Sequence, residues 1–245
     1  MFKIQVYYHL YIPQNEQGLM WTWWVDEQLG LMKTSKLTDV ATINMCITMP
    51  MWWVDLNGKT FSQNVTDYIN TRYPFVNIVD VRDTGQPNLY EGQTLRFLYD
   101  HCKSHDGVVL YLHSKGVRYN TGPVACWRQI LNHFCITEWP KALMKINDHD
   151  LVGVRDATCD EYKVSGNFWW AKNEFIRSLS EPLDSKAYEE RPSYHPGGPD
   201  YRYSFETWLW NCKPNVGHLV NTNKVHYDEY CFLESLTEKI HETTL

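Results

Sequence analysis

The feature that most constrains the fold is a short apolar run at residues 108–112, which passes directly into His113-Ser114-Lys115-Gly116. A run of β-branched and apolar residues bounded by turn residues is typical of a strand buried on both faces. Ligands of open α/β sheets lie beyond the carboxyl ends of the strands. We therefore expect His113, Ser114 and Lys115 at the mouth of a site, although a strand followed by an ordinary polar turn explains the same pattern.

Strand-like runs alternate with helical segments along much of the chain. The patterns predict strands at 3–12, 39–49, 76–81, 108–112 and 151–154, and helices at 20–32, 61–72, 89–103, 126–138 and 140–146. This alternation favours right-handed βαβ units and a mostly parallel sheet covered by helices. The predicted fold class is α/β and Rossmann-like. No linker rich in Pro, Ser or Gly divides the chain, so we expect a single domain over residues 1–245.

Charge and hydropathy exclude some classes of protein. The formal net charge is -6, and no dense block of Lys or Arg occurs. A binder of duplex nucleic acid needs a basic face for the phosphates, so that class is disfavoured. No apolar run reaches the ~18 residues of a membrane span, and no signal peptide is evident. The seven cysteines include no C-x-x-C pair. We expect reduced thiols, a cytoplasmic location and no transmembrane segment.

A second polar stretch, Ser165-Gly166-Asn167, precedes two tryptophans, Trp169 and Trp170. A hydroxyl, an amide and a permissive backbone beside an aromatic wall suit a sugar, which offers hydroxyls for hydrogen bonds and a flat C–H face. A Gly-Asn turn followed by the start of a buried aromatic helix explains the stretch equally well.

A third stretch contains a candidate general base. Glu206 lies between Phe205 and Trp208, near the start of a short predicted helix that Ser204 could cap. Aromatic neighbours desolvate a carboxylate and can make it a base. The alternative is a glutamate that only favours the helix dipole. The preceding residues 181–203 are rich in Pro, Gly and charge, which indicates either a functional lid or a disordered segment.

Other chemistries find little support. His113, His218 and His226 adjoin strand-like segments and could join carboxylates in a metal site, but their spacing does not demand one, and no HExxH motif or paired Cys supports it. Dinucleotide binding through GxGxxG, phosphate binding through GxxxxGK[ST] and a GxSxG nucleophile are unsupported, because none of these motifs occurs.

Three segments in order carry a family resemblance: YLHSKG at 111–116, WR at 127–128 and SGNFWWAK at 165–172. Together they resemble a group of predicted glycosyltransferases with the pattern Y-x-H-[ST]-K-G … W-R … G-N-[FW]-W, distantly similar to rhamnan-synthesis proteins. The resemblance covers about residues 89–172. It implies the GT-A fold, with a nucleotide-binding half at about 1–116 and an acceptor-binding half at about 117–245. It also implies a role in polysaccharide biosynthesis.

The resemblance also implies roles for single residues. Those expected at the nucleotide-sugar donor and its diphosphate are Tyr8, Asp83, Glu91, His113, Ser114, Lys115 and Arg128. Those expected at the donor sugar and the glycan acceptor are Ser165, Gly166, Asn167, Trp169 and Trp170.

Metal dependence is left open by this resemblance. Most GT-A enzymes carry Asp-x-Asp where this chain has His113 to Gly116, and that carboxylate pair binds Mn²⁺ and the diphosphate. Here Lys115 and Arg128 could neutralise the diphosphate instead. If Mn²⁺ or Mg²⁺ binds, His113 and His226 are the candidate ligands.

The implied reaction is sugar transfer with inversion. Glu206 would remove a proton from the acceptor hydroxyl, and Asp156, after the fifth predicted strand, is the competing candidate for the base. Two alternatives stay open. One is a non-catalytic carbohydrate-binding protein on the same fold. The other is an unrelated α/β hydrolase or phosphatase with His and Asp in a cleft.

Overall fold

The predicted fold class is confirmed: a computed structural model of the chain is an α/β protein built on one seven-stranded sheet. It describes residues 3–13, 20–50, 58–83, 91–114, 122–156, 164–183, 205 and 207–222. The strands are β1 (Ile4–Tyr11), β2 (Ala41–Met49), β3 (Val76–Asp83), β4 (Val108–His113), β5 (Leu151–Asp156), β6 (Trp169–Lys172) and β7 (Val216–Thr222).

Helices connect most of these strands. They are α1 (Trp21–Thr34), α2 (Phe61–Arg72), α3 (Gly92–Ser104), α4 (Gly122–Asn132), α5 (Trp139–Ile146) and α6 (Asn173–Ser178). Shorter helical segments are η2 (Leu37–Asp39), η3 (His133–Thr137), η4 (Ser165–Asn167) and η5 (Trp208–Cys212). Within the described ranges, every helix is too short or too polar to cross a lipid bilayer.

The sheet is parallel except for one strand. Its order is β3-β2-β1-β4-β6-β5-β7, and β6 runs antiparallel to both β4 and β5. The other neighbouring pairs are parallel. The chain builds outward from β1 to β2 and β3, then returns to place β4 on the other side of β1. The space beyond the ends of β1 and β4 is therefore a topological switch point, where open α/β sheets bind ligands.

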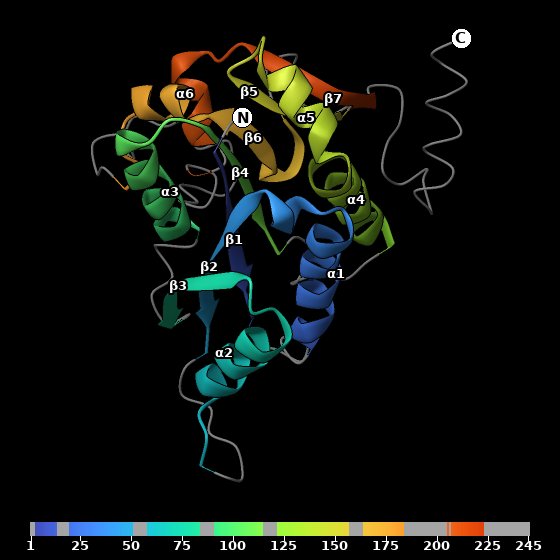
Figure 1. Ribbon diagram of the computed structural model, residues 1–245, viewed down its shortest axis with the longest axis vertical. Helices are drawn as coiled ribbons and strands as arrows, with labels where there is room; N and C mark the ends of the chain where they lie inside the picture. The colour runs from blue at the N-terminus through green and yellow to red at the C-terminus, as the bar shows by residue number, and fades with distance from the viewer. Residues whose placement is uncertain are drawn as a thin grey trace, which may run out of the picture.

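Helices cover both faces of the sheet (Figure 1). Buried side chains of α1, α2, α4 and α5 pack on one face, together with Val6, Tyr8 and Leu10 of β1. Buried side chains of α3 and α6 pack on the other face, with Tyr7 of β1. This alternation along β1 follows from the period of two in a strand. The buried run at 108–112 alternates in the same way, so β4 is covered on both faces as predicted.

Most predicted boundaries agree with the structure, and the start of α2 does so in detail. The Thr60 hydroxyl accepts from the Gln63 N–H, and the Gln63 side chain accepts from the Thr60 N–H. This reciprocal capping box satisfies two backbone donors at the helix start. Thr60 is therefore the N-cap of α2.

Two regions differ from the expectation. The single helix predicted at 126–138 is α4 followed by the π-helical turn η3, and both Cys135 and Ile136 in that turn are fully buried. The aromatic stretch after Asn167 is a strand, β6, rather than a helix start. Its residues alternate between the two faces, with Trp170 in one core cluster and Trp169 in the other.

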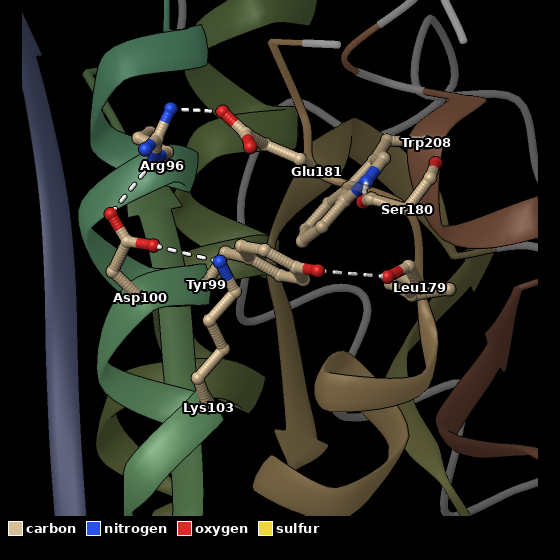
Figure 2. A network of polar contacts seen from close by, with 8 residues as sticks. All are labelled: Arg96, Tyr99, Asp100, Lys103, Leu179, Ser180, Glu181 and Trp208. Atoms are coloured by element: carbon tan, nitrogen blue, oxygen red, sulfur yellow. Dashed lines mark hydrogen bonds and ion pairs between the residues drawn. The ribbon is translucent and has the colours of Figure 1, made fainter.

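The chain after α6 is held between α3 and η5 (Figure 2). Tyr99 donates to the Leu179 carbonyl at 3.2 Å, and the Trp208 indole N–H donates to the Ser180 carbonyl at 2.8 Å. Arg96 forms an ion pair with Glu181. The chain is therefore fixed up to the boundary of residues 184–204, which contain most of the predicted lid or disordered segment and lie outside the described residues.

Candidate functional site

Ser114 joins the ends of the two central strands at the switch point. Its backbone N–H donates to the His9 carbonyl at 3.0 Å. Its hydroxyl accepts from the Tyr11 N–H at 2.9 Å and donates to the Tyr11 carbonyl at 3.2 Å. The side chain is buried, so its role here is to close the gap between β1 and β4. The geometry gives no support to the expected contact between this hydroxyl and the nucleotide-sugar donor.

His113, the last residue of β4, contacts the turn before β6. Its Nε2 lies 3.0 Å from the Gly166 carbonyl oxygen. Because a carbonyl only accepts, this geometry requires the proton on Nε2. The ring also meets Phe168 edge-on, with centroids 5.2 Å apart. The structure thus brings together the first and third motifs, which are far apart in the sequence.

The turn at 165–167 has an unusual backbone. Gly166 (φ 65°) and Asn167 (φ 55°) both adopt left-handed conformations. A Cβ on Gly166 would lie 2.5 Å from the Leu131 side chain in a backbone conformation that side chains rarely adopt, so glycine is favoured there. The Ser165 hydroxyl accepts from the Trp127 indole N–H at 2.7 Å. The second motif therefore joins the other two at this edge of the sheet.

Glu91 links this turn to β4. The Tyr111 hydroxyl donates to its Oε2 and the Asn167 amide donates to its Oε1, both at 2.8 Å. Asn167 in turn accepts from the Trp169 indole N–H at 2.9 Å. Glu91 is only 7% exposed, and both of these donors are neutral. We call Glu91, Tyr111, Asn167 and Trp169 the Glu91 cluster.

A buried histidine lies on the same face. His9 Nδ1 is 2.9 Å from the Thr94 hydroxyl of α3. Burial lowers the pKa of His9 to about 4, so the ring is neutral at neutral pH. It therefore offers no positive charge to a diphosphate. No sequence pattern distinguished His9 or Thr94 from other residues.

Arg128 is a correction to the expected donor site. It is 1% exposed, and its Nε donates to Glu27 at 2.8 Å. Asn132 donates to the same carboxylate at 3.1 Å. Gln28 donates to Asn132 at 3.1 Å and to the His113 carbonyl at 3.2 Å. Arg128 is thus part of a buried network between α1 and α4. Its positive charge is paired with Glu27 inside the protein and does not face a diphosphate. We call Glu27, Gln28, Arg128 and Asn132 the Arg128 cluster.

Three aromatic side chains expected at the ligand lie in the core instead. Tyr8, Trp169 and Trp170 are all fully buried. β6 lies between β4 and β5, so helices and turns cover both its faces, and Trp169 stacks on Tyr111 with centroids 5.2 Å apart. Neither indole can form the expected stacking surface. Among the described residues, the Tyr8 hydroxyl has no hydrogen-bond partner, and burial raises its pKa.

The remaining candidates are not gathered at this point. Asp83 ends β3, which β2 separates from β1. Lys115, Glu206 and His226 lie outside the described residues, as does the side chain of Asp156 at the end of β5.

The neighbour of Glu206 does have a defined position. A Cβ on Gly92 would lie 2.4 Å from the Phe205 ring, so Phe205 packs on the residue that follows Glu91. Across the ranges that the structure describes, no three His, Cys, Asp or Glu side chains are grouped closely enough to hold a metal ion.

The Arg128 cluster was only partly visible in the sequence. Glu27 and Gln28 interrupt a helix whose apolar residues occupy more than one face, and that interruption was the available signal. Trp23, from the first turn of the same helix, was not distinguished from the core tryptophans. It is 48% exposed.

The chain matches the model of one protein family, described as a domain of unknown function (DUF8361), over residues 7–198. No curated protein matches it. The matched range starts within β1, continues through β6 and includes all three motifs at the switch point. Since the match covers most of its length, the chain belongs to the DUF8361 family of domains of unknown function.

Proposed function

We propose that the protein is a glycosyltransferase that moves a sugar from a nucleotide-sugar donor to a hydroxyl of a glycan or polysaccharide, with inversion. The observation that carries the proposal is the convergence of three separated motifs beyond the ends of β1 and β4. His113 contacts Gly166, Trp127 contacts Ser165, and Glu91 holds Asn167. A ligand site at a switch point of this kind is general to open α/β sheets.

The polar groups at this edge suit a sugar better than a phosphate. Among the described residues here, His113 is bound to a carbonyl, and Arg128 is paired with Glu27. Neutral amide, imidazole and backbone groups are the donors and acceptors that match hydroxyls. In this proposal the charge of the donor diphosphate is neutralised by Lys115, by a divalent cation, or by both.

The proposed base is Glu206. Support comes from Phe205, the residue before Glu206, because its ring packs on Gly92 beside Glu91. The carboxylate takes the proton of the acceptor hydroxyl. The hydroxyl oxygen forms a bond to the anomeric carbon while the bond to the nucleoside diphosphate breaks, and the leaving group takes that electron pair. Positive groups near the diphosphate stabilise the charge it gains.

The first test is a thermal-shift screen with UDP, GDP, TDP and CMP, each with and without Mn²⁺. A ligand that binds only the folded protein raises the melting temperature by mass action. We expect a shift with one nucleotide, and the matching nucleotide sugar should then be turned over with a glycan acceptor. A shift that requires Mn²⁺ would assign the diphosphate charge to a metal. Binding of glycans with no response to any nucleotide would instead identify a carbohydrate-binding protein.

Variants separate the roles of single residues. Glu206→Gln should abolish transfer while nucleotide binding persists, whereas Asp156→Asn should retain transfer. The opposite pattern would make Asp156 the base. Met144→Ala is the matched control, because Met144 is exposed on α5 and lies in none of the three motifs.

A further inference from the structure

Trp23 stands beyond the ends of the central strands. In α1, Gln28 reaches the carbonyl of His113, the last residue of β4, so that part of the helix is level with the strand end. Trp23 comes five residues earlier, and a rise of 1.5 Å per residue puts it about 7.5 Å further out. The first turns of α1 lie at the end of the sheet to which the arrows of β1 and β2 point (Figure 1). The half-exposed ring is thus at the edge where ligands bind.

The indole rests on a fixed cation. The guanidinium carbon of Arg128 lies 5.7 Å from the centroid of the Trp23 ring. Arg128 is itself buried and bound to Glu27. One part of the indole surface is therefore supported by the Arg128 cluster, and the exposed remainder is available for contact with a ligand.

The cation also selects the kind of ring that fits. The face of an indole carries negative charge, which attracts cations and the weakly positive C–H groups of a sugar. The guanidinium of Arg128 already interacts with that negative charge, so the C–H groups of a sugar would be attracted to the ring less strongly. A nucleobase stacks through its own π system, and stacking of this kind tolerates any base.

Resting on the proposed function, we propose that Trp23 is the stacking platform for the nucleobase of the donor. The platform belongs to α1, within the half of the chain expected to hold the nucleotide. It is connected to the motif site, because Arg128, Glu27, Asn132 and Gln28 form a chain of contacts that ends on the His113 carbonyl. A base on Trp23 would place the diphosphate and the sugar toward the end of β4.

The experiment is calorimetric titration of the wild type, Trp23→Ala, Trp23→Phe and Met144→Ala with the nucleotide found in the thermal screen. Inorganic pyrophosphate serves as the probe without a base. We expect Trp23→Ala to weaken nucleotide binding about ten-fold or more, from the usual contribution of one aromatic stack. Trp23→Phe should weaken it less, since a ring remains, and Met144→Ala should not change it. Pyrophosphate binding should be equal in the wild type and Trp23→Ala.

Each contrary result has a distinct meaning. Equal nucleotide affinity in the wild type and Trp23→Ala would overturn the platform and leave the transferase proposal standing. A parallel loss of pyrophosphate binding in Trp23→Ala would also overturn it, because the ring would then act on the phosphates or on folding. Absence of nucleotide binding in the wild type would overturn both proposals.

Discussion

A partly buried and a buried carboxylate, Glu27 and Glu91, lie near the end of β4 on opposite faces of the sheet, and they are held in different ways. Glu27, on the α1 face, accepts from the guanidinium of Arg128. Glu91, on the α3 face, accepts from the Tyr111 hydroxyl and the Asn167 amide. A hydroxyl can reverse its role and accept, whereas a guanidinium can only donate. In these contacts the first carboxylate supplies charge to its partner, whereas the second supplies two acceptor oxygens to neutral groups.

The largest effect is expected from Glu27→Gln. The substitution keeps the shape of the side chain but removes the negative charge next to a guanidinium that is 1% exposed. Breaking a buried ion pair by neutralising one partner costs several kcal/mol, because the other charge stays desolvated. Glu27 is itself 20% exposed, so we expect a loss at the lower end, about 3 kcal/mol. Urea denaturation measured at neutral pH gives this free energy of unfolding.

The double variant Glu27→Gln, Arg128→Met is the control for that result. Removing both charges leaves no buried ion to solvate, so the double variant should be more stable than Glu27→Gln alone. A double variant less stable than Glu27→Gln would show that packing around Arg128, and not its charge, stabilises the α1–α4 contact.

A smaller effect is expected from protonation of His9, which lies on the same face of the sheet as Glu91. His9 packs against Thr94 of α3, and burial lowers its pKa from 6.5 to about 4. Well above pH 6.5 His9 is neutral in both states, and its contribution to stability is complete. As the pH falls toward 4, the unfolded chain binds a proton that the folded chain does not, so stability is lost. Between pH 7 and 5 we expect a loss of about 2 kcal/mol from this residue.

The matched variant is His9→Asn, compared with the wild type in urea denaturation at both pH values. Burial also lowers the pKa of His101 and His133, and both contribute in the same direction to either protein. The difference in pH dependence between the wild type and His9→Asn therefore gives the contribution of His9 to the free energy of unfolding. Equal pH dependence in the wild type and the variant would mean that His9 is protonated without cost in the folded state.

The sequence predicted the fold through its periodicities. The run at 108–112 became the central strand β4, and the alternating segments became a sheet with helices on both faces. β6 was not predicted, because Trp169 and Trp170 face opposite sides of the sheet and so remove any polar–apolar alternation. A contiguous apolar run of this kind does not distinguish a central strand from a buried helix.

The site was predicted only in part, because local sequence patterns locate an edge of the sheet but not the partners of each side chain. Neighbouring motif residues identified the edge of the sheet, and His113, Gly166 and Asn167 do meet there. The sequence did not reveal that Arg128 is paired with Glu27, since the two are on different helices and 101 positions apart. Nor did it separate the exposed Trp23 from buried tryptophans, because composition carries no information about the depth of a side chain.

The smallest effect, and the sharpest test of the comparison, is expected from Glu91→Gln. The new amide can keep both contacts: its oxygen accepts from Asn167, and its NH₂ donates to the Tyr111 oxygen. Only the direction of one hydrogen bond changes, so the expected loss is about 1 kcal/mol in the same urea measurement. Glu91→Leu, which is similar in size, removes both acceptors and should cost about 2–3 kcal/mol.

These two values decide between charge and geometry at Glu91. If Glu91→Gln is as damaging as Glu27→Gln, the negative charge matters on both faces and the contrast between the clusters is false. If Glu91→Gln is tolerated and Glu91→Leu is not, the oxygens of Glu91 act by fixing the left-handed turn at Gly166 and Asn167. Nucleotide or glycan binding should then persist in Glu91→Gln and weaken in Glu91→Leu, because the turn that His113 contacts would lose its support.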